Sequence, residues 1–216
     1  MTFPLSTFMK DWRAARDVDG TKIVQAELDL VMAAIAGTYQ PGLPLPMAPA
    51  APTAEPAWVR AGRSKIGERE IPGPKHNQWI LGFWQKLGAP WIKTDDADGA
   101  WCGGFVAWCL NEAGLPYPKN YPAARSFADW GMACKPRVGA IGVKARKGGN
   151  HVFLIVGETA DKAYFKALGG NQNNQVSIID IRKSDTKFIR WPTGAVLPPF
   201  SSLPVLPKGT IGASEA

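Results

Sequence analysis

The sequence has few of the residues that build crosslinks and metal sites, since its 216 residues include three cysteines and two histidines. Three cysteines do not make a disulfide framework. Cys102 and Cys109 stand two turns apart on one predicted helix, roughly 10 Å, which is too far for a bond between them. Cys134 is a weak candidate partner for Cys109. With only His76 and His151 and no paired-cysteine spacing, a zinc site is disfavoured, and we expect neither a metal nor an organic cofactor.

Long hydrophobic runs are also lacking. No apolar stretch reaches the ~18 residues that are needed to cross a membrane. The first residues, Met1 to Ser6, lack the charged start and the apolar stretch of a secretory signal. We therefore expect a soluble product made in the cytosol, without stable membrane insertion, which needs another agent for release if it acts elsewhere.

Negative charge is scarce in one part of the chain. The formal net charge is +7, but residues 57–194 hold 20 Lys and Arg against 11 Asp and Glu, whereas residues 1–56 hold 4 against 6. A basic domain suits an anionic polymer such as nucleic acid, a membrane surface or a bacterial wall. An equally weighted interpretation is that the charge only aids solubility. Nucleic acid is the weakest of these partners, because the cations are scattered and no groove-reading motif is present.

The composition divides the chain into four segments. Residues 1–40 predict two helices, the second with one apolar stripe, and such a pair must dock, dimerise or contact a partner such as the wall or a membrane. Residues 41–56 are rich in proline and alanine and predict a semi-rigid linker. Residues 57–194 form the main domain. Residues 195–216 predict a second extended, proline-rich tail without chemistry.

In the main domain the hydrophobic period changes from helical to strand-like near Gly139. We predict helices at 58–66, 78–87 with Asn77 as its cap, 102–113 and 123–130, and strands at 140–144, 151–157, 162–168, 175–181 and 187–191. Helices followed by a meander of strands indicate an α+β domain with an antiparallel sheet.

The chain is organised around the helix that begins near Cys102. Its side chains leave almost no polar face, so we expect the helix to be buried. In the first turn the free backbone N–H groups and the helix dipole favour a thiolate. Gly103 and Gly104 are poor helix residues, and their expected use is to leave space for another strand or a substrate near the sulfur. A buried core cysteine is the alternative for Cys102 and our interpretation of Cys109.

His151 opens a predicted strand just after a Gly-Gly-Asn turn, so its ring is expected at the rim of the sheet. A cysteine at a helix start that faces such a histidine forms a thiol nucleophile with its base. A third group must fix the imidazole tautomer. Asn171, where the partner strand leaves the sheet, is our prediction for that group, and Gln172 could instead bind substrate. A rim histidine without a partner is the plainer alternative.

These residues resemble those of a phage and prophage family of peptidoglycan hydrolases (endolysins), which are similar to NlpC-type and CHAP-type papain-like cysteine peptidases. The resemblance covers residues 57–192 and rests on four motifs in order: Ile66-Gly-Glu-Arg-Glu-Ile-Pro-Gly-Pro-Lys-His-Asn77, Trp101-Cys-Gly-Gly-Phe-Val-Ala-Trp-Cys-Leu110, His151-Val and Gly169-Gly-Asn-Gln. Where relatives commonly have Cys-Ala-Ala and Gly-Asp-Ile, this chain has Cys102-Gly-Gly and Gly139-Ala-Ile. The second change removes a carboxylate near the start of the sheet.

The resemblance implies a papain-like fold and a triad of Cys102, His151 and Asn171 that cleaves amide bonds in the peptide part of murein, as an endopeptidase or an N-acetylmuramoyl-L-alanine amidase. It implies a protein made in the host bacterium and released to the wall or periplasm, with a holin as one route. For substrate binding, the polar and junction segments suggest Trp101, Gln172, Glu70, His76 and Asn77. Trp101 could equally cover the core, and His76 could be no more than a helix-start residue. The alternatives are an antibacterial toxin with the same chemistry and a wall-binding module with a dead site.

Overall fold

The computed structural model describes residues 55–95, 100–146 and 148–209. The chain divides into a unit of residues 1–54 and a unit of residues 55–216. The helix pair predicted for residues 1–40 and nearly all of the linker predicted for residues 41–56 therefore lie outside the described residues. Within the described part, no helix is long and apolar enough to span a bilayer.

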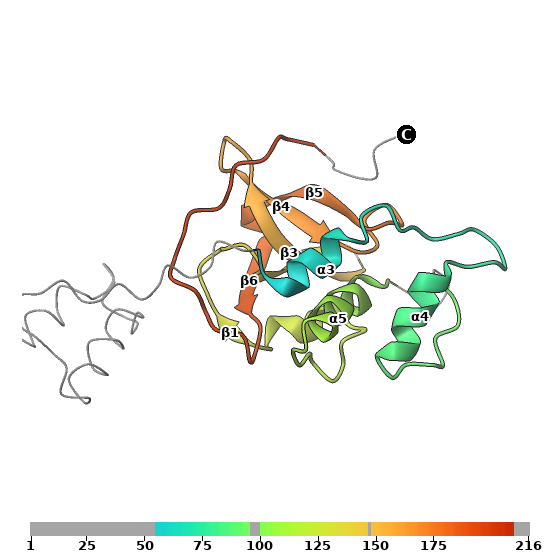
Figure 1. The fold of residues 1–216 in the computed structure, drawn as a ribbon. Helices are drawn as coiled ribbons and strands as arrows, with labels where there is room; N and C mark the ends of the chain where they lie inside the picture. The colour runs from blue at the N-terminus through green and yellow to red at the C-terminus, as the bar shows by residue number, and fades with distance from the viewer. Residues whose placement is uncertain (1–54, 96–99, 147, 210–216) are drawn as a thin grey trace, which may run out of the picture. The chain divides into compact units, whose positions relative to one another are not determined.

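The described part of the second unit is an α+β domain built on one six-stranded antiparallel sheet (Figure 1), as the sequence predicted. The strands lie in the order β1-β6-β2-β3-β4-β5. Their bounds are β1 (Met132–Ala133), β2 (Ile141–Arg146), β3 (Gly149–Glu158), β4 (Tyr164–Gly169), β5 (Ser177–Arg182) and β6 (Thr186–Trp191). β3 and β4 are buried almost throughout, so the middle of the sheet carries the core.

The strands do not form the simple meander that the sequence suggested. β2 to β5 follow one another, but β6 pairs with β2 at the other side of the sheet, although only the three-residue helix η2 (Lys183–Asp185) separates it from β5. Four inter-strand spacings of about 4.8 Å exceed the reach of so short a connection in a flat sheet. The sheet must therefore curl, and register shifts at Val143/Lys144 and Ile155/Gly157 provide the bends.

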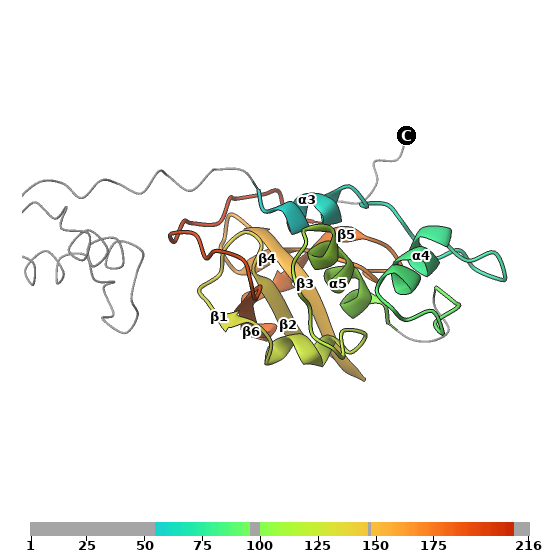
Figure 2. The ribbon, with the colours of Figure 1, turned by 60° about the horizontal axis from the view of Figure 1, so that its bottom comes forward.

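The helices gather on the sheet in a defined order. α5 (Cys102–Glu112) packs on β3 and β4, and α3 (Ala57–Arg63) packs on α5 and β4. α4 (Gln78–Lys86) packs on α5 and lies away from the strands in both views (Figures 1 and 2). The predicted cap is confirmed, because the Asn77 side chain accepts the Trp79 N–H at 2.8 Å and the Ile80 N–H at 3.2 Å. The segment predicted as a helix at 123–130 is a 3-10 helix, η1 (Ala124–Ala128).

The tail predicted at residues 195–216 is partly integrated into the domain. The backbone of Glu158 donates to the Pro204 carbonyl and accepts from the Leu206 N–H, both at 2.9 Å. The buried ammonium of Lys166 donates to two further carbonyl oxygens of the tail, at 2.6 and 2.7 Å. Proline content predicted an extended chain correctly, but it gave no sign that backbone groups of the sheet would pair with that chain.

Candidate active site

Cys102 is the first residue of α5, and it is buried, with 1% of its surface exposed. The backbone N–H of Val152 in β3 faces its sulfur, and together with the N–H groups of Gly103 and of Cys102 itself it opposes the rise in the pKa of the thiol that burial causes. The helix start thus holds the sulfur against the residue that follows His151. The predicted helix start is confirmed, whereas the predicted bond between the thiol and the His151 ring is not present.

The two glycines after the cysteine are required by close packing. A Cβ on Gly103 would lie 2.2 Å from the carbonyl oxygen of Tyr121, and one on Gly104 would lie 2.4 Å from the Trp84 ring. The glycines do leave space, but the prediction that a strand or a substrate would occupy it near the sulfur is wrong. The space holds other parts of this chain, the Tyr121–Pro122 backbone and an α4 side chain, instead of a substrate or a strand.

His151 lies on β3 with 4% of its surface exposed, and its ring stacks on Phe153 at 5.9 Å between centroids. Its Nε2 lies 3.0 Å from Oε1 of Gln172. The sequence prediction placed Asn171 in this role, and that assignment is wrong in this structure. Asn171 adopts a left-handed backbone with φ of 55° in the turn after β4, and the next residue, with its longer side chain, reaches the ring.

The hydrogen bonds of Gln172 define the tautomer of the histidine. Its Nε2 donates to the carbonyl oxygens of Ser177 at 2.6 Å and Ala167 at 3.2 Å, which fixes the amide with Oε1 towards the imidazole. Because that oxygen only accepts, Nε2 of His151 carries the proton. The lone pair is then on Nδ1, which is buried and has no hydrogen-bond partner among the described residues.

The Cys102 sulfur interacts with the backbone of the residue after His151, but no hydrogen bond joins it to the ring, since Nδ1 has no partner among the described residues and Nε2 bonds to Gln172. Burial raises the pKa of the Cys102 thiol, against the opposing effects of the Val152 N–H and the charge of Arg146. Burial also lowers the pKa of His151 to about 4, with Gln172 opposing this change. The resting pair is thus a neutral thiol and a neutral imidazole. The sequence argument expected an ion pair, and it failed because the cost of burying charge exceeds the stabilisation from the helix end.

Two of the residues expected to bind substrate bind each other. Trp101 is fully buried, and its Nε1 donates to the Glu70 carboxylate at 2.6 Å. Gly170 packs on the same indole, because a Cβ there would lie 2.5 Å from the ring. Trp101 therefore covers the core beside the cysteine and ties three segments together, and it offers no open face for a substrate.

His76 and Asn77 are engaged in the same way. Nδ1 of His76 lies 2.9 Å from Asp95, whose carboxylate also accepts the backbone N–H groups of Ile71 at 2.8 Å and Asn77 at 2.6 Å. The Asn77 side chain caps α4 and donates to Glu68 at 2.9 Å. These polar groups lock the 68–77 loop onto the domain, so their contacts are structural.

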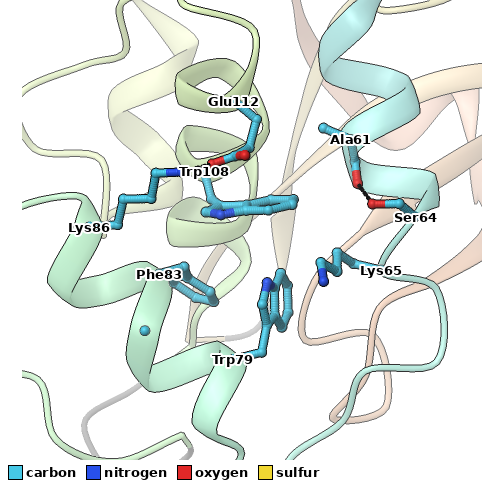
Figure 3. A pocket seen from close by; sticks show the side chains of 9 residues that line it. Ala61, Ser64, Lys65, Trp79, Phe83, Lys86, Trp108 and Glu112 are labelled. Atoms are coloured by element: carbon cyan, nitrogen blue, oxygen red, sulfur yellow. Dashed lines mark hydrogen bonds and ion pairs between the residues drawn. The ribbon is translucent and has the colours of Figure 1, made fainter.

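Two cavities lie close to α5. One of about 410 Å³ lies among α3, α4 and α5, where Trp79 and Trp108 meet at 86° and Lys86 pairs with Glu112 (Figure 3). Another of about 300 Å³ is lined by Ala100 and Pro122, near the start of α5, with five further residues. Neither lining includes Cys102 or His151, and because both residues are buried, a substrate reaches them only after a local rearrangement.

Sequence reasoning missed two cations beside the pair. Lys144 is the register partner of His151 on β2, and Arg146 follows two residues later at the end of the strand. Alternate residues of β2 point to the same face of the sheet, so Lys144 and Arg146 share a face. That this face is the one with His151 becomes clear only once the register of β2 to β3 is known. The described residues contain no group of three or more His, Cys, Asp or Glu side chains placed to hold a metal ion.

The geometry thus combines a helix-start thiol, a histidine with its lone pair on Nδ1 and a glutamine that fixes that tautomer. The chemistry that this set can perform is attack by sulfur on an electrophilic carbon with imidazole as the base.

Neither the scan against protein-family models nor the search of curated proteins finds a match to this chain.

Proposed function

We propose that this protein is a peptidoglycan hydrolase of the endolysin type, with a papain-like domain that cleaves an amide bond in the peptide part of murein. The observation that carries the proposal is the position of the Cys102 sulfur. It lies at the start of α5 against Val152 of β3, directly after a histidine whose Nε2 is held by Gln172. Gln172 takes the orienting role that the resemblance assigned to Asn171.

In the proposed reaction, Nδ1 of His151 takes the proton of the Cys102 thiol as the sulfur attacks the carbonyl carbon of the substrate amide. Backbone N–H groups at the start of α5 stabilise the oxyanion. The imidazolium then protonates the leaving amine, and a thioester remains on Cys102. His151 next removes a proton from water, which attacks the thioester carbon; the C–S bond then breaks, the acid product leaves, and the imidazolium returns the proton to the sulfur. Hydrogen bonds between such groups are often long before substrate binds.

The substrate class follows from the resemblance and from charge. The four motifs resemble those of murein hydrolases, and the basic 57–194 segment suits an anionic wall polymer. No pattern for reading nucleic acid accompanies these cations. The protein would act on the wall or in the periplasm after release from the cytoplasm in which it is made, with a holin as one route.

The decisive experiment digests purified sacculi with the full chain and with Cys102→Ala. We expect the wild-type protein to solubilise the sacculi and the variant to release nothing above background, a loss of about 10⁴-fold or more. Mass spectrometry of the released muropeptides identifies the bond, because each cleaved amide leaves a new amine at a distinct position.

Cys109→Ala is the matched control, because it removes a thiol from the same helix without touching the site. It should digest sacculi at the wild-type rate. Circular dichroism of both variants tests that they are folded. Wall lysis by a folded Cys102→Ala protein would contradict the mechanism, and binding to sacculi without any released product from the wild type would favour a wall-binding module.

A further inference from the structure

Some of the polar side chains around Cys102 and His151 form hydrogen bonds or ion pairs within the chain, and others do not. On the α4 side, Glu70, His76 and Asn77 all bind other groups of the chain. On the β2 side, Lys144 and Arg146 make no hydrogen bond or ion pair with any residue that the structure describes. Among the described residues near the pair, the charged groups that the chain does not bind are therefore those at the end of β2.

The register of the sheet places these two cations relative to His151. In the antiparallel pair of β2 and β3, Lys144 stands opposite His151 and Arg146 opposite Gly149, and the register is uninterrupted between them. Residues directly opposite each other point to the same face, as do residues two apart on one strand. Lys144, Arg146 and His151 therefore share one face of the sheet.

Exposure increases along this face from the pair towards solvent. His151 is buried, Lys144 is half-buried and Arg146 is exposed. The charge of Arg146 acts on both the Cys102 sulfur and the His151 ring, and that of Lys144 acts on the ring. A substrate that enters from this end meets two positive charges immediately before the sulfur.

We propose that Lys144 and Arg146 form a carboxylate-binding rim, which selects substrates with a free carboxylate next to the scissile amide. This inference rests on the proposed function and specifies its substrate. An anion on the rim forms charge-assisted hydrogen bonds with the guanidinium and the ammonium. It also offsets two positive charges that otherwise oppose protonation of His151, so it favours the imidazolium that the reaction requires.

The test compares two sets of purified muropeptides that differ in one group. The second stem residue is D-glutamate with a free α-carboxylate in one set and the corresponding amide in the other. The wild-type protein should cleave the free acid with a kcat/KM about tenfold higher. In Lys144→Gln/Arg146→Gln this ratio should fall to about one, through loss of activity on the free acid.

Lys162→Gln provides the matched control, since Lys162 is an exposed cation in the turn between β3 and β4, at the opposite end of these strands from His151. It should keep the wild-type ratio. Raising the salt concentration should reduce the ratio in the wild type and in this control, because screening weakens exposed charges. The rim proposal would be overturned if the wild type cleaved both substrates equally. It would also be overturned if Lys162→Gln lowered the acid-to-amide ratio as much as Lys144→Gln/Arg146→Gln does.

A binding measurement separates failure of the rim from failure of the hydrolase assignment. Calorimetry with Cys102→Ala measures the affinity for each muropeptide without turnover. The rim is supported if the free acid binds more tightly than the amide and this difference disappears when Lys144→Gln/Arg146→Gln is added. This conclusion holds even if the wild type cleaves neither muropeptide, because the absence of cleavage would refute only the proposed hydrolysis. Equal affinity for acid and amide refutes the rim whatever the activity.

Discussion

The two ends of α5 carry cysteines with the same orientation and different surroundings. Cys102 and Cys109 lie seven residues apart on one side of the helix, and both are buried. Burial raises the pKa of both thiols. At Cys102 the Val152 N–H and the charge of Arg146 oppose that rise. At Cys109 the charge of Glu112 adds to it, and the pKa lies well above its usual value.

The contrast shows that burial alone does not separate a nucleophile from a core residue. What differs is the set of groups that would stabilise a thiolate once the site opens: free N–H groups and a cation at one end of the helix, and a carboxylate at the other. A helix has unpaired N–H groups only in its first turn. Position along the helix therefore decides which of two similar thiols can perform chemistry.

The largest expected difference between the two ends is in thiol alkylation. Cys102 is the first residue of α5, so a local opening of the helix start exposes it, whereas Cys109 lies deeper in the same helix and needs global unfolding. Local openings are less costly than global unfolding. We therefore expect iodoacetamide to modify Cys102 at least about 10³-fold faster than Cys109 under native conditions.

Peptide mass spectrometry after timed labelling resolves the two sites, and the half-buried Cys134 serves as an internal reference. Labelling of Cys102 should also accelerate as pH rises, because the thiol is neutral at pH 7 and only the thiolate reacts. Modification of both helix cysteines at one rate would show that they share a single unfolding event.

The second prediction concerns pH and His151. Its pKa is about 4 in the folded protein, against an ordinary value of 6.5. Between these values the unfolded chain binds more protons, so the free energy of unfolding rises with pH. The stability present above pH 6.5 should be lost as pH falls towards 4, by on the order of 3 kcal/mol.

Urea denaturation at pH 7.0 and 4.5 measures this loss, with His151→Gln as the comparison. Carboxylates titrate in both proteins, so the difference between their pH dependences isolates the histidine. The kcat/KM of the wild type should also show no loss from protonation of His151 until the pH falls to about 4, because the imidazole stays neutral above that pH. An acid limb near 6.5 would mean that His151 is hydrated and open before substrate binds.

The third prediction separates the two neighbouring amides. Gln172→Ala removes the acceptor at Nε2 of His151 and should lower kcat/KM by about 10²-fold, since the imidazole loses its fixed tautomer. Asn171→Gly keeps the left-handed backbone of that position and should leave activity near the wild-type value. Muropeptide release under equal enzyme concentrations provides the measurement. The reverse order of effects would restore Asn171 as the orienting residue.

Local signals predicted local structure well in this chain. The Asn77 cap, the buried helix at Cys102 and the change from helices to strands near Gly139 were all available from residue pattern, and the structure confirms them. The strand order was not available, because pairing of β6 with β2 depends on how far the sheet curls. Charge state was also missed, since the burial that keeps the thiol neutral is a property of the packed domain.

The sequence did not distinguish which of two adjacent amide side chains, Asn171 or Gln172, contacts His151. Asn171 and Gln172 carry the same functional group, and sequence placed both at the end of β4. The left-handed φ of 55° at Asn171 determines which one reaches His151. Asparagine tolerates that conformation better than most residues, so it favours the turn. The three asparagines at positive φ thus form the turn, and the glutamine among them contacts His151.

The smallest effect that we predict tests the close packing at the start of α5. Gly103→Ala would place a Cβ 2.2 Å from the Tyr121 carbonyl oxygen, and backbone moves less readily than a side chain. We expect a loss of about 2 kcal/mol in the free energy of unfolding. Gly82→Ala in α4 is the matched control, because nothing lies within 4 Å of its Cβ and alanine should add up to about 1 kcal/mol of stability in a helix. Urea denaturation of both variants measures the difference. Equal stability gains in the two proteins would mean that the Tyr121–Pro122 segment yields easily, and that the space beside the sulfur is accessible to a substrate after all.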